Sequence, residues 1–554
     1  MDGILDAAAY FFHQGTNYRA YEYMGAHPTD YGGRVFRIWA PNALSVCLVG
    51  DFCDWNTGIP MERIDDGGIW QCTVDRGVSD IGDKYKYKIM GSDGISRYKT
   101  DPYAFFAESL PNGASIIYDE GAYNWRDDGF LSYRRSKAGR MDTMPLNIYR
   151  LSPTRWNGST GGWSSLAREL APYVKQMGYT HIELEDITEI SLLYATNASM
   201  GTPQDFMAFV DSMHEAGVGV IIDRRMTGGF EEDYGIRFLD GQPLYEKSGV
   251  GLSFAFGCNE VECFLISNAH YWFEKFHVDG LRLCDVEPTL SLETVGFFRK
   301  LTAHIKADFP DALVMCDRIS DRDNVTNFKN GGLGFDFKLS DSPDVDGERY
   351  VLSSPVPSND LAKTRAELGY FMTRQGKKLW EMGTEIGEHS EGSIDWSILG
   401  LEDRARLQLY SADLGQLYLS TPSLWQNEGH RGVKRLGDPK KEVICFLRAD
   451  KGGEETVVVV NLTADGNDRF RVGVPTGGTY REIFNSDDQR YGGSGWLNFD
   501  DIKSQTRPWN NQDNSIVVRI APKSIVILQR ISRSSTPRKT ITAYQTAKIR
   551  TTIK

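Results

Sequence analysis

Carboxylates, an arginine and two cysteines stand at or just after the ends of three short apolar segments of this chain. The segments are GVGVIID, DGLRLCD and ALVMCD, and each has the length of one buried strand. The chemistry-bearing residues are Asp223, Arg282, Cys284, Asp285, Cys316 and Asp317. Carboxylates and thiols are residue types that can do acid–base or nucleophilic chemistry, so these strand ends are examined first.

The spacing within DGLRLCD determines which of these side chains can share a face. Strand side chains alternate with a period of two, so Arg282 and Cys284 point one way and Asp285 points the other. Only a bulge or a turn that starts at Asp285 could turn its carboxylate toward Arg282. Cys284 and Cys316 are expected to be small apolar fillers rather than a disulfide or metal ligands.

The elements that position these residues are predicted from strand and helix patterns. Short strands with Gly/Asp turns at 34–40, 45–50, 69–74 and 84–90 predict a small β-sandwich. From residue 146 onward strands and helices alternate, which predicts a (β/α)8 TIM-type barrel with trimmed loops. Its eight strands are expected at 147–151, 180–184, 217–223, 279–284, 312–316, 334–339, 349–352 and 378–382. Apolar strands return after residue 442. The expected domains are a lead-in (1–33), an N-terminal sandwich (34–130), the barrel (131–430), a C-terminal all-β domain (431–530) and a disordered basic tail (531–554).

Composition excludes several classes of protein. The 554 residues carry 62 Lys+Arg and 75 Asp+Glu, a net charge of −13, which argues against nucleic-acid binding. We find no long apolar run and no apolar leader, and therefore expect a cytoplasmic protein with no membrane segment. The eight cysteines form no CxxC pair, so neither a disulfide framework nor a metal site is expected. No phosphate-binding, zinc-protease or serine-esterase motif appears, and no cofactor is expected.

Several blocks of sequence resemble one family in order along the chain. FRIWAPNA, VGDFCDWN and DPYA are similar to the N-terminal carbohydrate-binding sandwich of the 1,4-α-glucan (glycogen) branching enzymes. MGYTHIEL, AGVGVIID and the segment around DGLR resemble that family's α-amylase-type barrel, and NSDDQRYGGSG resembles its C-terminal sandwich. The similarity runs from about residue 18 to 530.

The resemblance implies a retaining glucanosyl transfer with two carboxylates. A nucleophile at the end of barrel strand 4 and an acid at the end of strand 5 must lie about 5–5.5 Å apart. Here the nucleophile position is Cys284, and counting back from Gly331 puts the acid position at Cys316, with a register uncertain by one. Asp285 and Asp317 are the stand-ins that could replace the lost pair.

Three of the family's other site residues survive. They are Asp223, Arg282 and Asp360, which we expect to form a residual ion-pair network at the barrel mouth. The two histidines implied by the resemblance are replaced by Gly228 and Asn359, and the segment between 187 and 200 is shorter than in the family. A thiol is a weak glycosidase acid because its pKa lies near 8.5.

These observations favour a pseudoenzyme that binds α-glucan, or that regulates or scaffolds an active enzyme of glycogen metabolism. One alternative is an active branching enzyme that uses Asp285 and Asp317. Another is an assembly protein that uses the fold without binding sugar and docks through the basic tail, which contains six Lys/Arg and no Asp or Glu. Aromatic residues of the sandwich are the candidate sugar platforms, and we select Trp55, Trp70, Tyr85 and Tyr87.

Overall fold

The computed structural model forms two compact units. The first contains Met1–Ser354, Gly376–Gly383 and His389–Asp395, and the second contains Pro355–Gln375, Thr384–Glu388 and Trp396–Lys554. The structure describes residues 2–109, 112–119, 121, 123–156, 161–185, 187–188, 192–225, 235–247, 253–286, 291–317, 319, 325–326, 331–340, 349–389, 392–426, 433–436 and 442–531. Gly228 and the basic tail beyond residue 531 lie outside these ranges.

The first unit begins with a helix and a β-sandwich. Helix α1 (Asp2–His13) was not predicted, and the 3-10 turn Ala20–Glu22 follows it. One sheet has the order β1 (Gly25–Pro28), β2 (Arg34–Trp39), β6 (Ile69–Val74) and β5 (Glu62–Arg63). The other has the order β4 (Ile59–Pro60), β3 (Ser45–Gly50), β7 (Lys84–Met90) and β8 (Ser96–Lys99), with β9 (Ser115–Ile116) also paired to β7. The four predicted strands of this region are confirmed.

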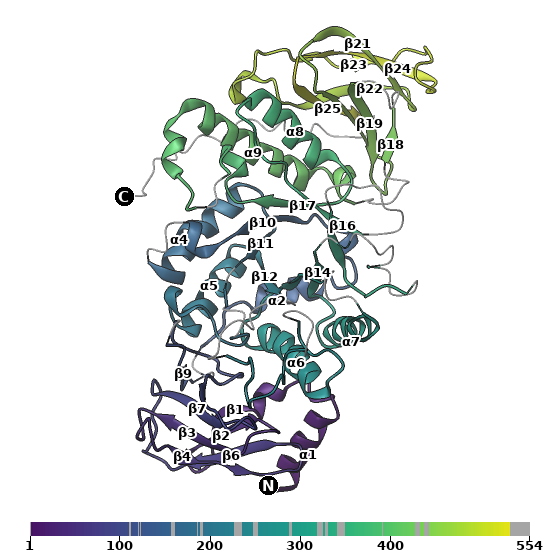
Figure 1. Cartoon of the computed structure of the whole chain (residues 1–554). Helices are drawn as coiled ribbons and strands as arrows, with labels where there is room; N and C mark the ends of the chain where they lie inside the picture. Colours follow the sequence, from purple (N-terminus) through teal and green to yellow (C-terminus); the bar gives the residue numbers. More distant parts are fainter. Residues whose placement is uncertain are drawn as a thin grey trace. The chain divides into compact units, whose positions relative to one another are not determined.

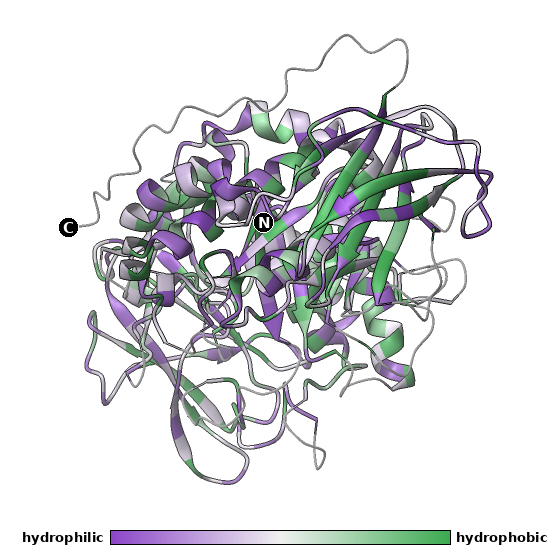
Figure 2. Ribbon diagram, turned by 90° about the horizontal axis from the view of Figure 1, so that it is seen from above, coloured by the Kyte–Doolittle hydropathy of each residue, from purple (hydrophilic) through white to green (hydrophobic). Residues whose placement is uncertain are grey.

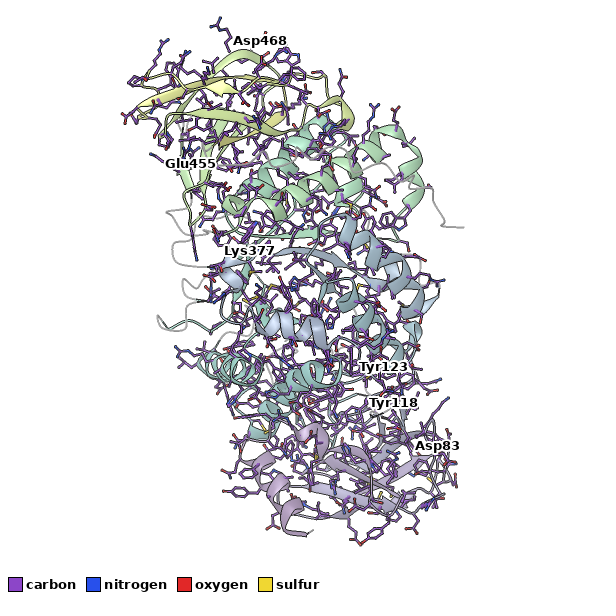
Figure 3. All side chains as sticks on the ribbon, turned by 180° about the vertical axis from the view of Figure 1, so that it is seen from behind. Asp83, Tyr118, Tyr123, Lys377, Glu455 and Asp468 are labelled. Carbon is purple, nitrogen blue, oxygen red and sulfur yellow. The ribbon has the colours of Figure 1, made fainter. Side chains whose placement is uncertain are left out.

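Eight parallel strands close the predicted barrel in the same unit. They are β10 (Asn147–Leu151), β11 (His181–Leu184), β12 (Gly219–Arg225), β13 (Gly280–Cys284), β14 (Leu313–Cys316), β15 (Phe337–Ser340), β16 (Tyr350–Ser353) and β17 (Lys377–Glu381). Each lies within three residues of a predicted strand. Lys377, labelled in Figure 3, donates from Nζ to the carbonyls of Asp142 at 2.8 Å and Met144 at 2.7 Å, which ties β17 to the lead-in of β10.

Helices α4 (Gly162–Gln176), α5 (Pro203–Glu215), α6 (Asn259–Lys275) and α7 (Leu292–Asp308) lie around the barrel strands (Figure 1). Two shorter helices, α2 (Asp128–Arg135) and α3 (Pro153–Trp156), precede and follow β10 in the chain. Helix α5 begins at a capping box in which Thr202 and Asp205 satisfy each other's backbone amides, and Pro203 occupies the first turn. Ser291 and Thr294 form the equivalent box at α7. None of the helices that the structure describes is long and apolar enough to cross a membrane.

The second unit contains two helices and the C-terminal sheets. The helices are α8 (Leu361–Thr373) and α9 (Glu402–Ser420). A six-stranded sheet has the order β18 (Val433–Arg435), β19 (Val443–Ala449), β20 (Glu455–Asn461), β25 (Ser524–Ile531), β22 (Thr479–Asn485) and β23 (Ile502–Lys503), and β21 (Asn467–Val474) pairs with β24 (Asn514–Ile520). The wide apolar strands in Figure 2 belong to these sheets, whose core is rich in valine and isoleucine. The predicted all-β C-terminal domain is confirmed.

Candidate active site

The side chains that face the barrel axis follow from strand alternation. Ile148, Ile221, Leu313, Met315 and Leu379 form one apolar cluster inside the barrel. Two residues further along the same strands, toward their carboxyl ends, stand polar side chains on the same face. These are Arg150, Asp223, Asp317 and Glu381. The carboxyl ends of barrel strands are where TIM-barrel sites form, so this ring of charged groups is the candidate site.

Arg282 from β13 joins two carboxylates at this mouth. Its Nε donates to Glu183 Oε1 at 2.6 Å, and its Nη1 donates to Asp317 Oδ1 at 2.5 Å. The side chains of Arg282 and Glu183 are 3% and 0% exposed, so both charges are removed from water. Burial of this kind is tolerated only because each charge has an opposite partner.

Arg150 from β10 extends the network across the mouth. It lies 2.6 Å from Glu185, 3.0 Å from Glu381 and 3.3 Å from Glu183. The result is a continuous chain of alternating charges from Asp317 to Glu381. Arg150, Glu183, Glu185 and Glu381 were not predicted as site residues. Three of them, Arg150, Glu183 and Glu381, could have been recognised as charged residues at inward-facing positions of strands that are otherwise apolar.

Cys284 occupies the inward face at the end of β13, as its spacing from Arg282 predicts. The side chain is buried, and burial raises the pKa of its thiol well above the usual range, although Arg282 nearby acts in the opposite sense. Sγ lies 3.9 Å from the carbonyl oxygen of Arg282. A buried neutral thiol is a poor nucleophile, because the thiolate is the reactive form.

Asp317 rather than Cys316 faces the barrel axis after β14. Leu313 and Met315 point into the barrel, so Cys316 lies on the outer face of β14 and Asp317 on the inner face. Counting back along the chain placed the acid at Cys316 with a register uncertain by one residue, and the alternation of side chains favours Asp317 at the inward-facing position. The inward-facing side chain after β14 is therefore a carboxylate, one methylene shorter than glutamate.

Both oxygens of Asp317 already accept hydrogen bonds. Oδ1 accepts from Arg282, and Oδ2 accepts from the backbone N–H of Asp285 at 2.8 Å. The Asp317–Arg282 contact is an ion pair, and together with the Asp285 amide it fixes the orientation of the carboxyl group.

Asp285 leaves the strand geometry. Strand β13 ends at Cys284, and Asp285 adopts a left-handed backbone conformation with φ of 57°. The condition set out for re-aiming Asp285, a turn that starts there, is therefore met in the backbone. Its amide contributes to the site by anchoring Asp317.

Asp223 is a carboxylate on the inward face of β12, two residues after Ile221. It pairs in register with Arg282 between β12 and β13. Burial raises the pKa of Asp223 to about 7, although Arg282 acts in the opposite sense. Asp223 can therefore gain or lose a proton near neutral pH.

Asp360 does not belong to the Arg282 network. Its Oδ1 caps the N-terminus of α8 by accepting from the amides of Ala362 and Lys363, each at 3.1 Å. Its Oδ2 accepts from Lys523 Nζ at 2.6 Å. The prediction of a shared ion-pair network is thus wrong for Asp360, because its side chain serves as a helix cap.

Three of the four predicted sugar-binding aromatic residues lie in the core of the sandwich. Tyr85 and Tyr87 are 1% and 0% exposed, and both hydroxyls donate to Asp101, at 2.7 and 3.2 Å. Trp70 is 9% exposed and donates to the carbonyl of Ala40. These rings fill the space between the two sheets, so none offers a face to a sugar. The prediction is wrong for these three because their strand positions point inward.

Trp55 remains partly exposed. Its Nε1 donates to Asp51 at 3.1 Å. Lys88 on β7 donates to the carbonyl of the adjacent Asn56 at 2.8 Å, and its Nζ lies 5.7 Å from the ring centre of Tyr98 on β8. Tyr98 is 41% exposed. Trp55, in the turn after β3, and Lys88 and Tyr98, on the adjacent strands β7 and β8, thus form a partly exposed strip with two rings and a cation.

Family models match the two ends of the chain. Carbohydrate-binding module 48, described as the isoamylase N-terminal domain, matches residues 23–104. The alpha amylase C-terminal all-beta domain matches residues 436–531. The first match spans strands β1 to β8 of the sandwich, and the second spans strands β19 to β25 of the C-terminal sheets.

Full-length relatives share about a third of their residues with this chain. A 1,4-alpha-glucan branching enzyme of Halothermothrix orenii is 33% identical over 629 residues, covering 95% of this chain and 99% of the relative. One of Oceanobacillus iheyensis is 32% identical, covering 96% and 99%. Because an alignment of 629 positions exceeds the 554 residues here, the relative contains segments that this chain lacks.

The fold also matches solved structures of lower identity. A pullulanase from Paenibacillus barengoltzii, solved in complex with maltohexaose and alpha-cyclodextrin, has a TM-score of 0.69 at 15% identity and covers 92% of this chain and 95% of its own. This likeness supports the arrangement of sandwich, barrel and C-terminal domain.

Proposed function

Because this chain belongs to the 1,4-alpha-glucan branching enzyme family, we propose that it is a catalytically inactive member that binds α-glucan. The observation that carries the proposal is the pair of side chains facing the mouth after β13 and β14. One is the buried thiol of Cys284, and the other is Asp317, whose two oxygens accept hydrogen bonds from Arg282 and from the Asp285 amide. Retaining transfer needs a carboxylate nucleophile and a protonated acid at these places.

The charge network supports a structural role for the residues that remain. Arg150 and Arg282 are each paired with carboxylates, so both positive charges are compensated without a substrate.

Glucan binding is proposed on the sandwich at Trp55, Lys88 and Tyr98. Exposed aromatic rings stack on the apolar face of a pyranose, and the lysine can donate to its hydroxyls. A protein that holds glucan without transferring it would act in glycogen metabolism as a scaffold or regulator, with an active enzyme of that metabolism as a partner.

A branching assay tests the loss of chemistry. Purified protein is incubated with amylose, the iodine complex is followed, and the product is debranched to count new α-1,6 linkages. We expect no branching by the natural sequence. New branches that disappear in Asp317→Asn would refute the proposal and favour an active enzyme that uses Asp317 as its acid. Cys284→Asp together with Asp317→Glu supplies an aspartate nucleophile and a glutamate acid at these two places, and is the variant expected to gain activity if the rest of the site is competent.

Glycogen co-sedimentation tests binding separately. We expect the natural sequence to sediment with glycogen. Trp55→Ala should bind glycogen at least about tenfold more weakly, because losing one stacked ring costs roughly 1.4 kcal/mol of binding free energy. Tyr31→Ala is the matched control, because Tyr31 is 91% exposed in the turn between β1 and β2 and is not part of the strip. Sedimentation no greater than that of albumin would refute binding.

A further inference from the structure

An exposed tryptophan stands at the end of a β-hairpin in the C-terminal sheets. Trp509 is 37% exposed, and the two residues that follow it, Asn510 and Asn511, are exposed as well. Single apolar residues are common at protein surfaces, so exposure alone indicates no function. What distinguishes Trp509 is how firmly its backbone is held and which side chains lie beside its ring.

The turn that carries Trp509 has a defined backbone conformation. Trp509 and Gln512 exchange two backbone hydrogen bonds of 2.9 and 3.0 Å across a two-residue loop. Asn510 and Asn511 both adopt left-handed conformations, with φ of 49° and 60°. These are the conformations of a type I′ turn, which asparagine tolerates well. The indole is therefore carried by a tight turn rather than by a long loop.

The hairpin also packs closely on the neighbouring strand β21. A Cβ atom at Gly473 would lie 2.0 Å from the carbonyl oxygen of Trp509, so the approach of the two backbones requires glycine at this position. Further along the hairpin, Gln505 and Ser515 form an antiparallel pair with backbone hydrogen bonds of 2.8 and 3.0 Å. The ring is thus held in place from both the turn and the base of the hairpin.

Two polar side chains lie beside the ring. The guanidinium carbon of Arg471 on β21 lies 6.0 Å from the ring centre of Trp509. Nη1 of Arg471 donates to Gln505 Oε1 at 2.8 Å and to the buried Ser515 Oγ at 2.9 Å. These bonds fix the arginine and the glutamine next to each other. The guanidinium has further N–H donors, and the side-chain amide of exposed Gln505 has two.

An aromatic ring flanked by fixed donors matches the chemistry of a pyranose. The C–H groups on one face of a glucose unit pack on an indole, and the hydroxyls at its edge accept from guanidinium and amide groups. A protein partner would need an apolar centre around the ring. The exposed neighbours in the hairpin are instead mostly polar, namely Gln505, Thr506, Arg507, Asn510, Asn511 and Asp513.

We propose that Trp509, Arg471 and Gln505 form a second α-glucan contact, on the C-terminal sheets and separate from the strip that contains Trp55. The choice of ligand rests on the glucan binding proposed above, whereas the residues are different ones. Trp509 stacks on one glucose unit, and Arg471 and Gln505 donate to its hydroxyls.

The indole N–H signals of NMR spectra test each contact by itself. The full chain is isotope-labelled at tryptophan, and the signals of Trp509 and Trp55 are assigned by their absence in Trp509→Phe and Trp55→Phe. Maltoheptaose is then added to the natural sequence. We expect both signals to shift and to saturate. Arg471→Met should weaken binding at Trp509 by about tenfold and leave the response of Trp55 unchanged.

The possible outcomes separate this contact from the proposed function. A response of Trp55 with none at Trp509 overturns the second contact and leaves the proposed glucan binding on the sandwich intact. A response of Trp509 alone supports the second contact and refutes the strip. No response at either position refutes both. Because these spectra are read on the natural sequence, they do not depend on the folding of a truncated variant.

Glycogen co-sedimentation gives an independent measure. We expect Trp509→Ala to bind glycogen about tenfold more weakly than the natural sequence. Phe499→Ala is the matched control, because Phe499 is an 84% exposed ring in the same unit and is not part of the hairpin. It should bind as the natural sequence does. An equal loss in both variants would overturn the proposal, because it would indicate damage to the C-terminal sheets rather than the loss of one contact.

Discussion

Removing one partner of the Arg282–Glu183 pair should destabilise the barrel strongly. Arg282→Met deletes the donor that lies 2.6 Å from Glu183 Oε1 and 2.5 Å from Asp317. Glu183 is fully buried and keeps only the longer 3.3 Å contact with Arg150. Breaking a buried pair in this way costs about 3–5 kcal/mol, because one charge is left without compensation in a poorly solvated place.

A double-mutant cycle separates the pair from its surroundings. We expect Glu183→Leu to destabilise the protein as well, and the double variant Arg282→Met/Glu183→Leu to cost clearly less than the two single changes added together. The coupling should amount to about 2–3 kcal/mol. The assay is urea unfolding, with the free energy of unfolding and the m-value taken for all four proteins.

Arg481→Met is the control, because Arg481 is 54% exposed and its ion pair with Asp501 lies at the surface. We expect this change to alter stability by less than about 1 kcal/mol. Single variants that each cost less than 1 kcal/mol, or costs that simply add, would show that Arg282 and Glu183 are not mutually dependent. The charged residues at the barrel mouth would then not compensate one another, and the structural role proposed for them would be wrong.

Three further predictions concern stability. Burial lowers the pKa of His214, but Asp279 and Asp127 outweigh this effect and raise the pKa from 6.5 to about 9. The protonated His214 should therefore stabilise the fold fully below pH 6.5, and this stabilisation should be lost as the pH rises through 9. The urea midpoint should fall over that pH range in the natural sequence and stay flat in His214→Phe. Tyr87→Phe should cost about 1 kcal/mol of stability by losing its bond to Asp101 and leave glycogen sedimentation unchanged, and weaker sedimentation with an intact fold would contradict its place in the core. Asp285→Val should cost about 1–2 kcal/mol in thermal unfolding because of the left-handed backbone, whereas Asp285→Gly should not, and equal Tm values for these two would contradict that account.

Much of the fold could be predicted from local pattern. The strand at 147–151 has the predicted bounds, and the other seven barrel strands differ from prediction by at most three residues at either end. This succeeds because buried parallel strands are short apolar runs between turn residues, a signal that needs no knowledge of distant contacts. Helix α1 was not predicted, and its place depends on residues far away in the chain, through contacts such as those of His13 with Asp65 and Glu260.

The sequence by itself determined the family, the order of the domains and the thiol at position 284, because these depend on residue identity and short-range spacing. Only the tertiary structure decided that Asp317 rather than Cys316 faces the mouth, and that Arg150 joins Glu185 and Glu381 there. It also placed Tyr85 and Tyr87 in the core and gave Asp360 to a helix cap. The physical reason is the same in each case: the direction and partners of a side chain depend on strand phase and on residues far away in the chain, and neither is contained in a local motif.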